Sequence, residues 1–161
     1  MKTAPHRSQG FTVIELMVVV VVVVILGALV ALTYSGVQAK NRNGDRQTAI
    51  DTLQSQLETY YYAENTKYPT LAQLNDAAWR AKNLPKLAAN GLQDPRWSAK
   101  VTACTTGGKA VAAATPAANC YSYQVTAANG DACDNVKVDC VHYTLTAFLE
   151  GGDKYVKSSL N

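Results

Sequence analysis

A largely apolar run over residues 11–34 dominates the hydrophobic pattern of the chain, and it includes seven consecutive valines at 18–24. As a helix at about 1.5 Å per residue, the run would be roughly 36 Å long, which exceeds the ~30 Å hydrocarbon thickness of a bilayer. The pattern therefore predicts a helix that spans a membrane once.

Apolar residues keep a helical spacing after the sequence becomes polar near residue 35. They line one face of a helix, at Ile50, Leu53, Leu57, Tyr60 and Tyr61. We expect a single helix over residues 11–64, ending there because the residue before Pro69 is steered away from helical angles. Its second half should cover a sheet.

The remaining residues, 65–161, predict one small globular domain. Thr70 and Gln73 are spaced as a capping box for a short helix to about Arg80, and residues 84–116 read as loops. Strands are expected over residues 120–127, 140–149 and 154–159, with a hairpin turn at residues 151–152. The predicted fold class is α+β, a long N-terminal helix packed on a small antiparallel sheet.

The four cysteines, Cys104, Cys120, Cys133 and Cys140, all lie in the C-terminal third of the chain. An even number suits two disulfides in an oxidising compartment, which places this part outside the cytoplasm. Three connectivities are possible, and we favour pairing neighbours in the sequence. A zinc site is the alternative, but no C-x-x-C spacing occurs.

Glu15 is the only ionisable residue between Phe11 and Tyr34. A charged carboxylate at the centre of a membrane helix costs around 2.5–3.5 kcal/mol, so a compensating partner is expected. Cleavage after Gly10 would supply one, because the new amino group at Phe11 lies within one helical turn. A secretory signal peptide cut near residue 39 has too long an apolar region, and a plain membrane anchor leaves Glu15 unexplained.

A short basic leader ending in Gly10, then Phe11-Thr12-Val13-Ile14-Glu15 and an apolar run, resembles the class III signal of type IV pilins and of type II secretion pseudopilins. The resemblance implies that residues 1–10 are a leader, that a prepilin peptidase cuts after Gly10 and methylates Phe11, and that Glu15 pairs with the amine of a neighbouring subunit. It also implies a pilin-like fold, a homo-oligomeric filament with residues 11–34 in its core, and an assembly platform protein and ATPase as partners. Many pilins carry a proline in this helix, but none occurs here between Pro5 and Pro69.

Other candidate chemistry is sparse. Four oxygen-bearing residues crowd one loop and are candidate Ca²⁺ ligands, as the pseudopilin resemblance also suggests: Asp131, Asp134, Asn135 and Asp139. Their spacing matches no EF-hand, and we favour the simpler interpretation of ordinary turn residues in a solvated loop. No catalytic set is visible, so we expect no enzyme and no required cofactor. The net charge is +3, or +1 without residues 1–10, which by itself gives no polyanion-binding signature. A modest basic patch for DNA would rest on Lys137, Lys154 and Lys157, and a solvated face is the simpler interpretation.

The leading functional hypothesis is a structural subunit of a type IV pilus, serving adhesion, motility or DNA uptake. Before assembly it would cross the cytoplasmic membrane once, and afterwards it would lie in a pilus at the cell surface. Two alternatives stay open: a pseudopilin of a type II secretion or competence system, and a membrane-anchored extracellular binding module that never polymerises.

Overall fold

The computed structural model describes residues 10–63 and 66–161. Residues 1–9 of the expected leader and the expected end of the long helix at residues 64–65 lie outside this description. Two compact units are present, one comprising residues up to Ala39 and the other Lys40–Asn161.

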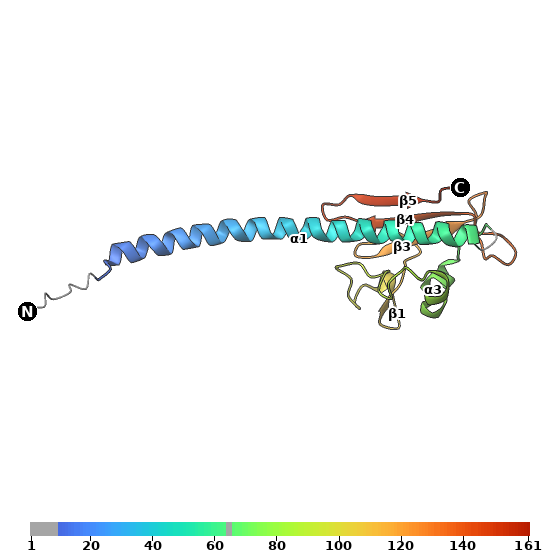
Figure 1. Cartoon of the computed structure of the whole chain (residues 1–161), viewed down its shortest axis with the longest axis horizontal. Coiled ribbons are helices and arrows are strands. Elements are labelled where there is room, and N and C mark those ends of the chain that lie inside the picture. Colours follow the sequence, from blue (N-terminus) through green and yellow to red (C-terminus); the bar gives the residue numbers. More distant parts are fainter. Residues whose placement is uncertain (1–9, 64–65) are drawn as a thin grey trace, which may run out of the picture. The chain divides into compact units, whose positions relative to one another are not determined.

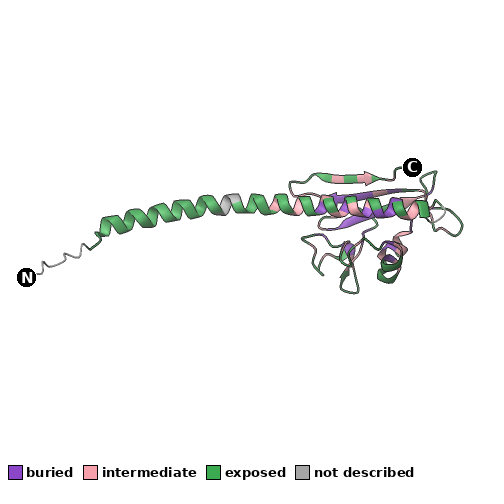
Figure 2. Cartoon of the chain, in the orientation of Figure 1, coloured by how far each residue is buried: buried purple, intermediate pink, exposed green. Residues whose placement is uncertain are grey.

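The chain forms the expected long helix, α1 (Val13–Ala63), which continues through its three glycines without a break (Figure 1). In the first unit its apolar side chains are exposed, and even the least exposed of the valines, Val22, is 48% exposed. Figure 2 shows this exposure over residues 13–30 and 34–38. By length and composition, α1 is the one helix among the described residues that is suited to cross a membrane.

The second unit contains a three-stranded antiparallel sheet with the order β3-β4-β5. These strands are β3 (Tyr121–Thr126), β4 (His142–Phe148) and β5 (Lys154–Ser158), so all three expected strands are confirmed. Gly151 and Gly152 both have positive φ in the turn between β4 and β5, a conformation that glycine adopts readily. The α+β fold class is therefore confirmed.

The core of this unit lies between α1 and the sheet. Ile50, Leu53 and Leu57 are buried on one face of α1, and they belong to the same cluster as Tyr143 and Leu145 of β4. Figure 2 shows the buried residues where α1 runs along the strands of this unit. The helical spacing seen in the sequence thus marks the side of α1 that packs on the sheet.

Two local expectations were wrong. The single helix expected to about Arg80 is broken into α2 (Leu71–Asn75) and α3 (Ala77–Asn83), although the Thr70 capping box is present. Asp76 causes the break, because its extended backbone ends α2 and its Oδ1 accepts hydrogen bonds from the first turn of α3.

The second error concerns the region expected to be only loops. A single 3-10 turn, η1 (Thr102–Cys104), leads into a short hairpin of β1 (Thr105–Thr106) and β2 (Lys109–Ala110). Gly107 and Gly108 connect the two strands and both have positive φ. The strands are too short to produce a detectable alternation in the sequence.

Candidate functional site

The start of α1 is closed by a reciprocal pair of side chains. The backbone N–H and the hydroxyl of Thr12 each donate to Glu15 Oε2 at 2.8 Å, and Thr12 Oγ1 accepts from the Glu15 N–H at 3.3 Å. This is a capping box, which satisfies N–H groups that the first turn of a helix leaves unpaired. Among the residues that the structure describes, Thr12 is therefore the hydrogen-bond partner of the Glu15 carboxylate.

The bond between Gly10 and Phe11 lies outside the helix. Both residues are exposed and have non-helical backbone, and a Cβ added at Gly10 would meet nothing within 4 Å. The side chains of Phe11 and Glu15 are also exposed. The expected cleavage position is thus accessible, one residue before the Thr12 cap, and the expected assembly carboxylate lies one helical turn further on.

A cluster of charges binds the beginning of the second unit to the β4–β5 hairpin. Arg46 donates from Nε and Nη2 to the two oxygens of Asp94, at 2.7 and 3.0 Å, and both side chains are almost fully buried. Glu150 accepts from Arg42 and lies 3.4 Å from Arg46 Nη1. Hydrogen bonding from Arg42, with the nearby positive charge of Arg46 and Arg96, lowers the pKa of Glu150 from 4.5 to about 2.

A buried carboxylate holds the other end of α1. Glu58 accepts from the hydroxyls of Tyr143 at 2.6 Å and Tyr68 at 2.9 Å, and the N–H of Leu160 approaches the same carboxylate at 3.3 Å. Burial, together with donation to Glu58, raises the pKa of the Tyr143 hydroxyl. Neither the arginine–carboxylate cluster nor the contacts of Glu58 were predicted, because the residues that meet there are far apart in the sequence.

The four cysteines form two disulfides, Cys104 with Cys120 and Cys133 with Cys140. These are the pairings between sequence neighbours. The first fastens the loop that carries the β1–β2 hairpin to the start of β3, and it packs with Ala113 in a small cluster. The second closes the acidic loop.

The acidic loop uses its oxygens for its own turns and contacts. Asp134 Oδ1 accepts three backbone N–H groups, from residues 136 to 138, and these bonds lower the pKa of the carboxyl. Asn135 binds the backbone of Tyr68 and Cys140, and Asp139 pairs with Lys67 at 2.7 Å. Asp131 accepts from Asn129. Within residues 10–63 and 66–161 there is no group of three or more His, Cys, Asp or Glu side chains suited to a metal ion.

The three lysines considered for a basic patch do not share one environment. Lys157 pairs with Asp51 of α1 at 3.1 Å, and Lys154 lies over the ring of Phe148. Lys137 is exposed in the acidic loop. His142, at the start of β4, has its Nδ1 3.1 Å from the backbone oxygen of Asn161.

Comparison with known proteins adds independent information. The family model described as "Prokaryotic N-terminal methylation motif" matches residues 5–31. Type II secretion system core protein G of Escherichia coli (strain K12) is 36% identical over 90 residues, which cover 54% of this chain and 59% of the relative. The protein of the same name from Dickeya chrysanthemi is 35% identical over 92 residues, covering 55% and 58%.

The chain thus spans less than two thirds of the length of these relatives. No solved structure gives a significant match. The methylation motif, the relatives, and the long helix on an antiparallel sheet agree with one another. Together they confirm the predicted resemblance to type IV pilins and type II secretion pseudopilins.

Proposed function

We propose that this protein is a pseudopilin, a filament-forming subunit of a type II secretion system. The observation that carries the proposal is its similarity to core protein G relatives over 90 residues, which is longer than the 5–31 methylation motif alone. This similarity favours the pseudopilin alternative over the type IV pilus subunit that led the sequence-based hypotheses. The role is structural and mechanical, and we propose no catalytic activity and no required cofactor.

The exposed apolar part of α1 supports a subunit that lies first in the membrane and later in a filament. Side chains such as Val19 and Ile25 are more than half exposed, and burying apolar surface is favourable by roughly 25 cal/mol per Å². Lipid covers this surface while the subunit is in the membrane, and helices of neighbouring subunits cover it in the filament. The membrane is crossed once, and the disulfide-bonded unit lies outside the cytoplasm, where thiols are oxidised.

Processing and assembly use the start of α1. A prepilin peptidase cuts after Gly10 and methylates Phe11, and the Glu15 carboxylate then pairs with the positively charged amine of a neighbouring subunit. Glu15 is exposed, and within residues 10–63 and 66–161 the hydrogen bonds to its carboxylate come from Thr12 and end at Oε2, which leaves Oε1 to face a neighbouring subunit. A platform protein and an ATPase are the proposed assembly partners.

Glu15→Ala tests the assembly role. We expect the variant to insert into the membrane as the unchanged protein does but to form few or no filaments, measured by shearing and immunoblotting of overproducing cells. Thr59→Ala, a change at an exposed polar position of α1, is the matched control and should assemble normally. Filament yield equal to that of the unchanged protein would overturn the role of Glu15.

Two further measurements test the processing of the chain and, separately, whether it serves type II secretion or a type IV pilus. The intact mass from cells should correspond to a chain beginning at Phe11, with one added methyl group and two disulfides; any other first residue contradicts the processing. Deleting the gene should block the release of type II secretion substrates and leave surface pili intact. Loss of pili with normal secretion would instead support the pilus alternative.

A further inference from the structure

Strand β3 lies at one edge of the sheet, and its outer side is only partly covered. Ala113 forms an isolated parallel bridge with Ser122. The Ala113 N–H donates to the backbone oxygen of Tyr121 at 2.8 Å, and the backbone oxygen of Ala113 accepts from the Tyr123 N–H at 3.0 Å. The chain then bends at Ala114, so the bridge is not continued along β3.

The next main-chain groups along this edge point outward. Alternate residues of a strand direct their N–H and C=O groups to opposite sides, so Val125 faces the same side as Tyr123. Tyr143 is opposite Val125 in the β3–β4 register, and its backbone oxygen accepts from the Ser159 N–H on the β5 side. The main-chain groups of Tyr143 therefore face β5 and not Val125. The Tyr123 C=O and both main-chain groups of Val125 therefore line the outer edge, and no hydrogen bond to them is found among the residues that the structure describes.

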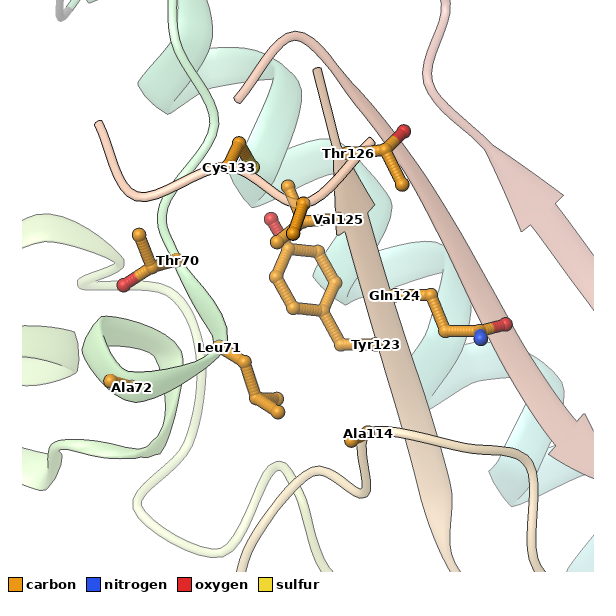
Figure 3. A pocket seen from close by; sticks show the side chains of 10 residues that line it. Thr70, Leu71, Ala72, Ala114, Tyr123, Gln124, Val125, Thr126 and Cys133 are labelled. Carbon is orange, nitrogen blue, oxygen red and sulfur yellow. The ribbon is translucent and has the colours of Figure 1, made fainter. Parts of the chain in front are cut away.

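A groove of about 470 Å³ runs along this part of the edge. Figure 3 shows that Val125 and Leu71 lie on one side of β3, with the start of α2 facing the strand, while Gln124 and Thr126 point to the other side. Ala114 and Cys133 also line the groove. We call this groove, with the Tyr123 C=O and the Val125 main chain, the β3 slot.

We propose that the β3 slot binds a short extended peptide segment of a partner protein by β-strand addition. An acceptor, a donor and a second acceptor in a row along a strand edge match the main chain of another extended segment, and main-chain hydrogen bonds of this kind supply affinity in strand addition. A carbohydrate or nucleotide would not reproduce this spacing together with the apolar wall at Leu71.

The two sides of the slot define the partner's side chains. A residue of the bound segment that faces Leu71 would be apolar, and its neighbours, which face Gln124 and Thr126, would be polar. One slot offers few hydrogen bonds, so a single contact is weak. In the filament of the proposed function, each subunit repeats the slot, and a partner with several such segments gains affinity by multivalency; binding to one subunit does not depend on that filament.

The test uses the full chain, isotopically labelled in detergent micelles, and the probe peptide acetyl-Thr-Val-Thr-Val-Thr-amide. In the free protein, the Val125 N–H should exchange with solvent faster than the N–H of Gln124, which belongs to the β3–β4 ladder. Adding the probe should shift the Val125 amide resonance saturably and slow its exchange. Slow exchange in the free protein, or no saturable shift, would overturn the proposal.

Two variants separate main-chain binding from side-chain effects. Val125→Pro removes the outward N–H without removing a ladder hydrogen bond, as proline at a sheet edge allows, and it should weaken the probe about tenfold. Val125→Ala keeps the N–H and should bind within about threefold of the unchanged protein. If Val125→Pro does not fold, a probe N-methylated at both of its valines decides the question with the unchanged protein. Equal binding by a folded Val125→Pro, or by the N-methylated probe, contradicts strand addition.

Discussion

Asp94→Asn is the sharpest test of how the second unit is held together. The substitution keeps the shape of the side chain and its acceptor for the Arg96 N–H, but it removes the negative charge opposite Arg46. The side chains of Arg46 and Asp94 are only 2% and 1% exposed, so water cannot replace the lost partner. A buried guanidinium is then left without its main counter-charge.

The magnitude follows from the contacts that remain. Breaking a buried ion pair by removing one partner costs about 3–5 kcal/mol. Arg46 keeps a hydrogen bond to Asn43 at 3.0 Å and the contact with Glu150 at 3.4 Å. We therefore expect the lower end of the range, a loss of about 3 kcal/mol in the free energy of unfolding, or roughly 10 °C in Tm for a unit of this size.

Urea unfolding of the full chain in micelles, followed by tryptophan fluorescence, measures this loss. Trp97 is a suitable reporter, since its backbone N–H donates to the Asp94 backbone oxygen at 2.9 Å. Asp153→Asn, the same chemical change at an exposed position, is the control and should stay within about 0.5 kcal/mol of the unchanged protein. Adding Arg46→Met to Asp94→Asn should restore part of the loss, because the uncompensated cation is gone. A cost for Asp94→Asn no larger than that of Asp153→Asn would refute the reasoning.

Three further predictions concern stability. Because the folded-state pKa of Glu150, about 2, lies below its ordinary 4.5, its contribution is fully present above about pH 4.5 and is lost as the pH falls towards 2; Glu150→Gln should flatten the unfolding free energy in that window. Replacing Cys104 and Cys120 with serine should cost about 3 kcal/mol, since their separation of 16 residues is close to that of a loop for which chain entropy gives this value. Thr70→Ala should cost about 1 kcal/mol through loss of the α2 cap, measured by thermal unfolding.

Each of these three has a contradicting result. An unchanged pH profile in Glu150→Gln would mean that the Arg42 contact contributes no pH-dependent stability. Equal melting of the serine variant and the oxidised unchanged protein would remove the stabilising role of the first disulfide. For the cap, Thr70→Ser keeps the acceptor oxygen and is the control, so equal losses in the serine and alanine variants would exclude the hydrogen bond as the cause.

Features set by neighbours in the sequence were predictable. The spacing of Ile50, Leu53 and Leu57 identified the buried face of α1, and the paired glycines at 151 and 152 identified the β4–β5 turn. The break at Asp76 was missed because a capping residue between two good helix formers carries no periodic signal. The spacing rule that identified the Thr70 capping box applies equally to Thr12 and Glu15, but the prediction gave the Glu15 carboxylate only an amine as its partner.

Contacts between distant parts of the chain were not predictable. Arg46 and Asp94 are 48 residues apart, and Tyr143 is 85 residues from the Glu58 carboxylate that it binds. Nothing in a local pattern distinguishes these residues from ordinary surface charges. The open edge of β3 also depends on where Ala113 leaves the strand, which follows from the path of a long loop rather than from β3 itself.

The position of the Thr12 cap has a consequence for maturation. Proteases generally act on backbone that is not hydrogen bonded in a helix, and the Gly10–Phe11 bond already has that form. Both members of the capping pair, Thr12 and Glu15, lie on the retained side of the proposed cut. Helix α1 would therefore enter the membrane with its first turn already formed. Removal of the leader would create the new amine at Phe11 without any rearrangement of that turn.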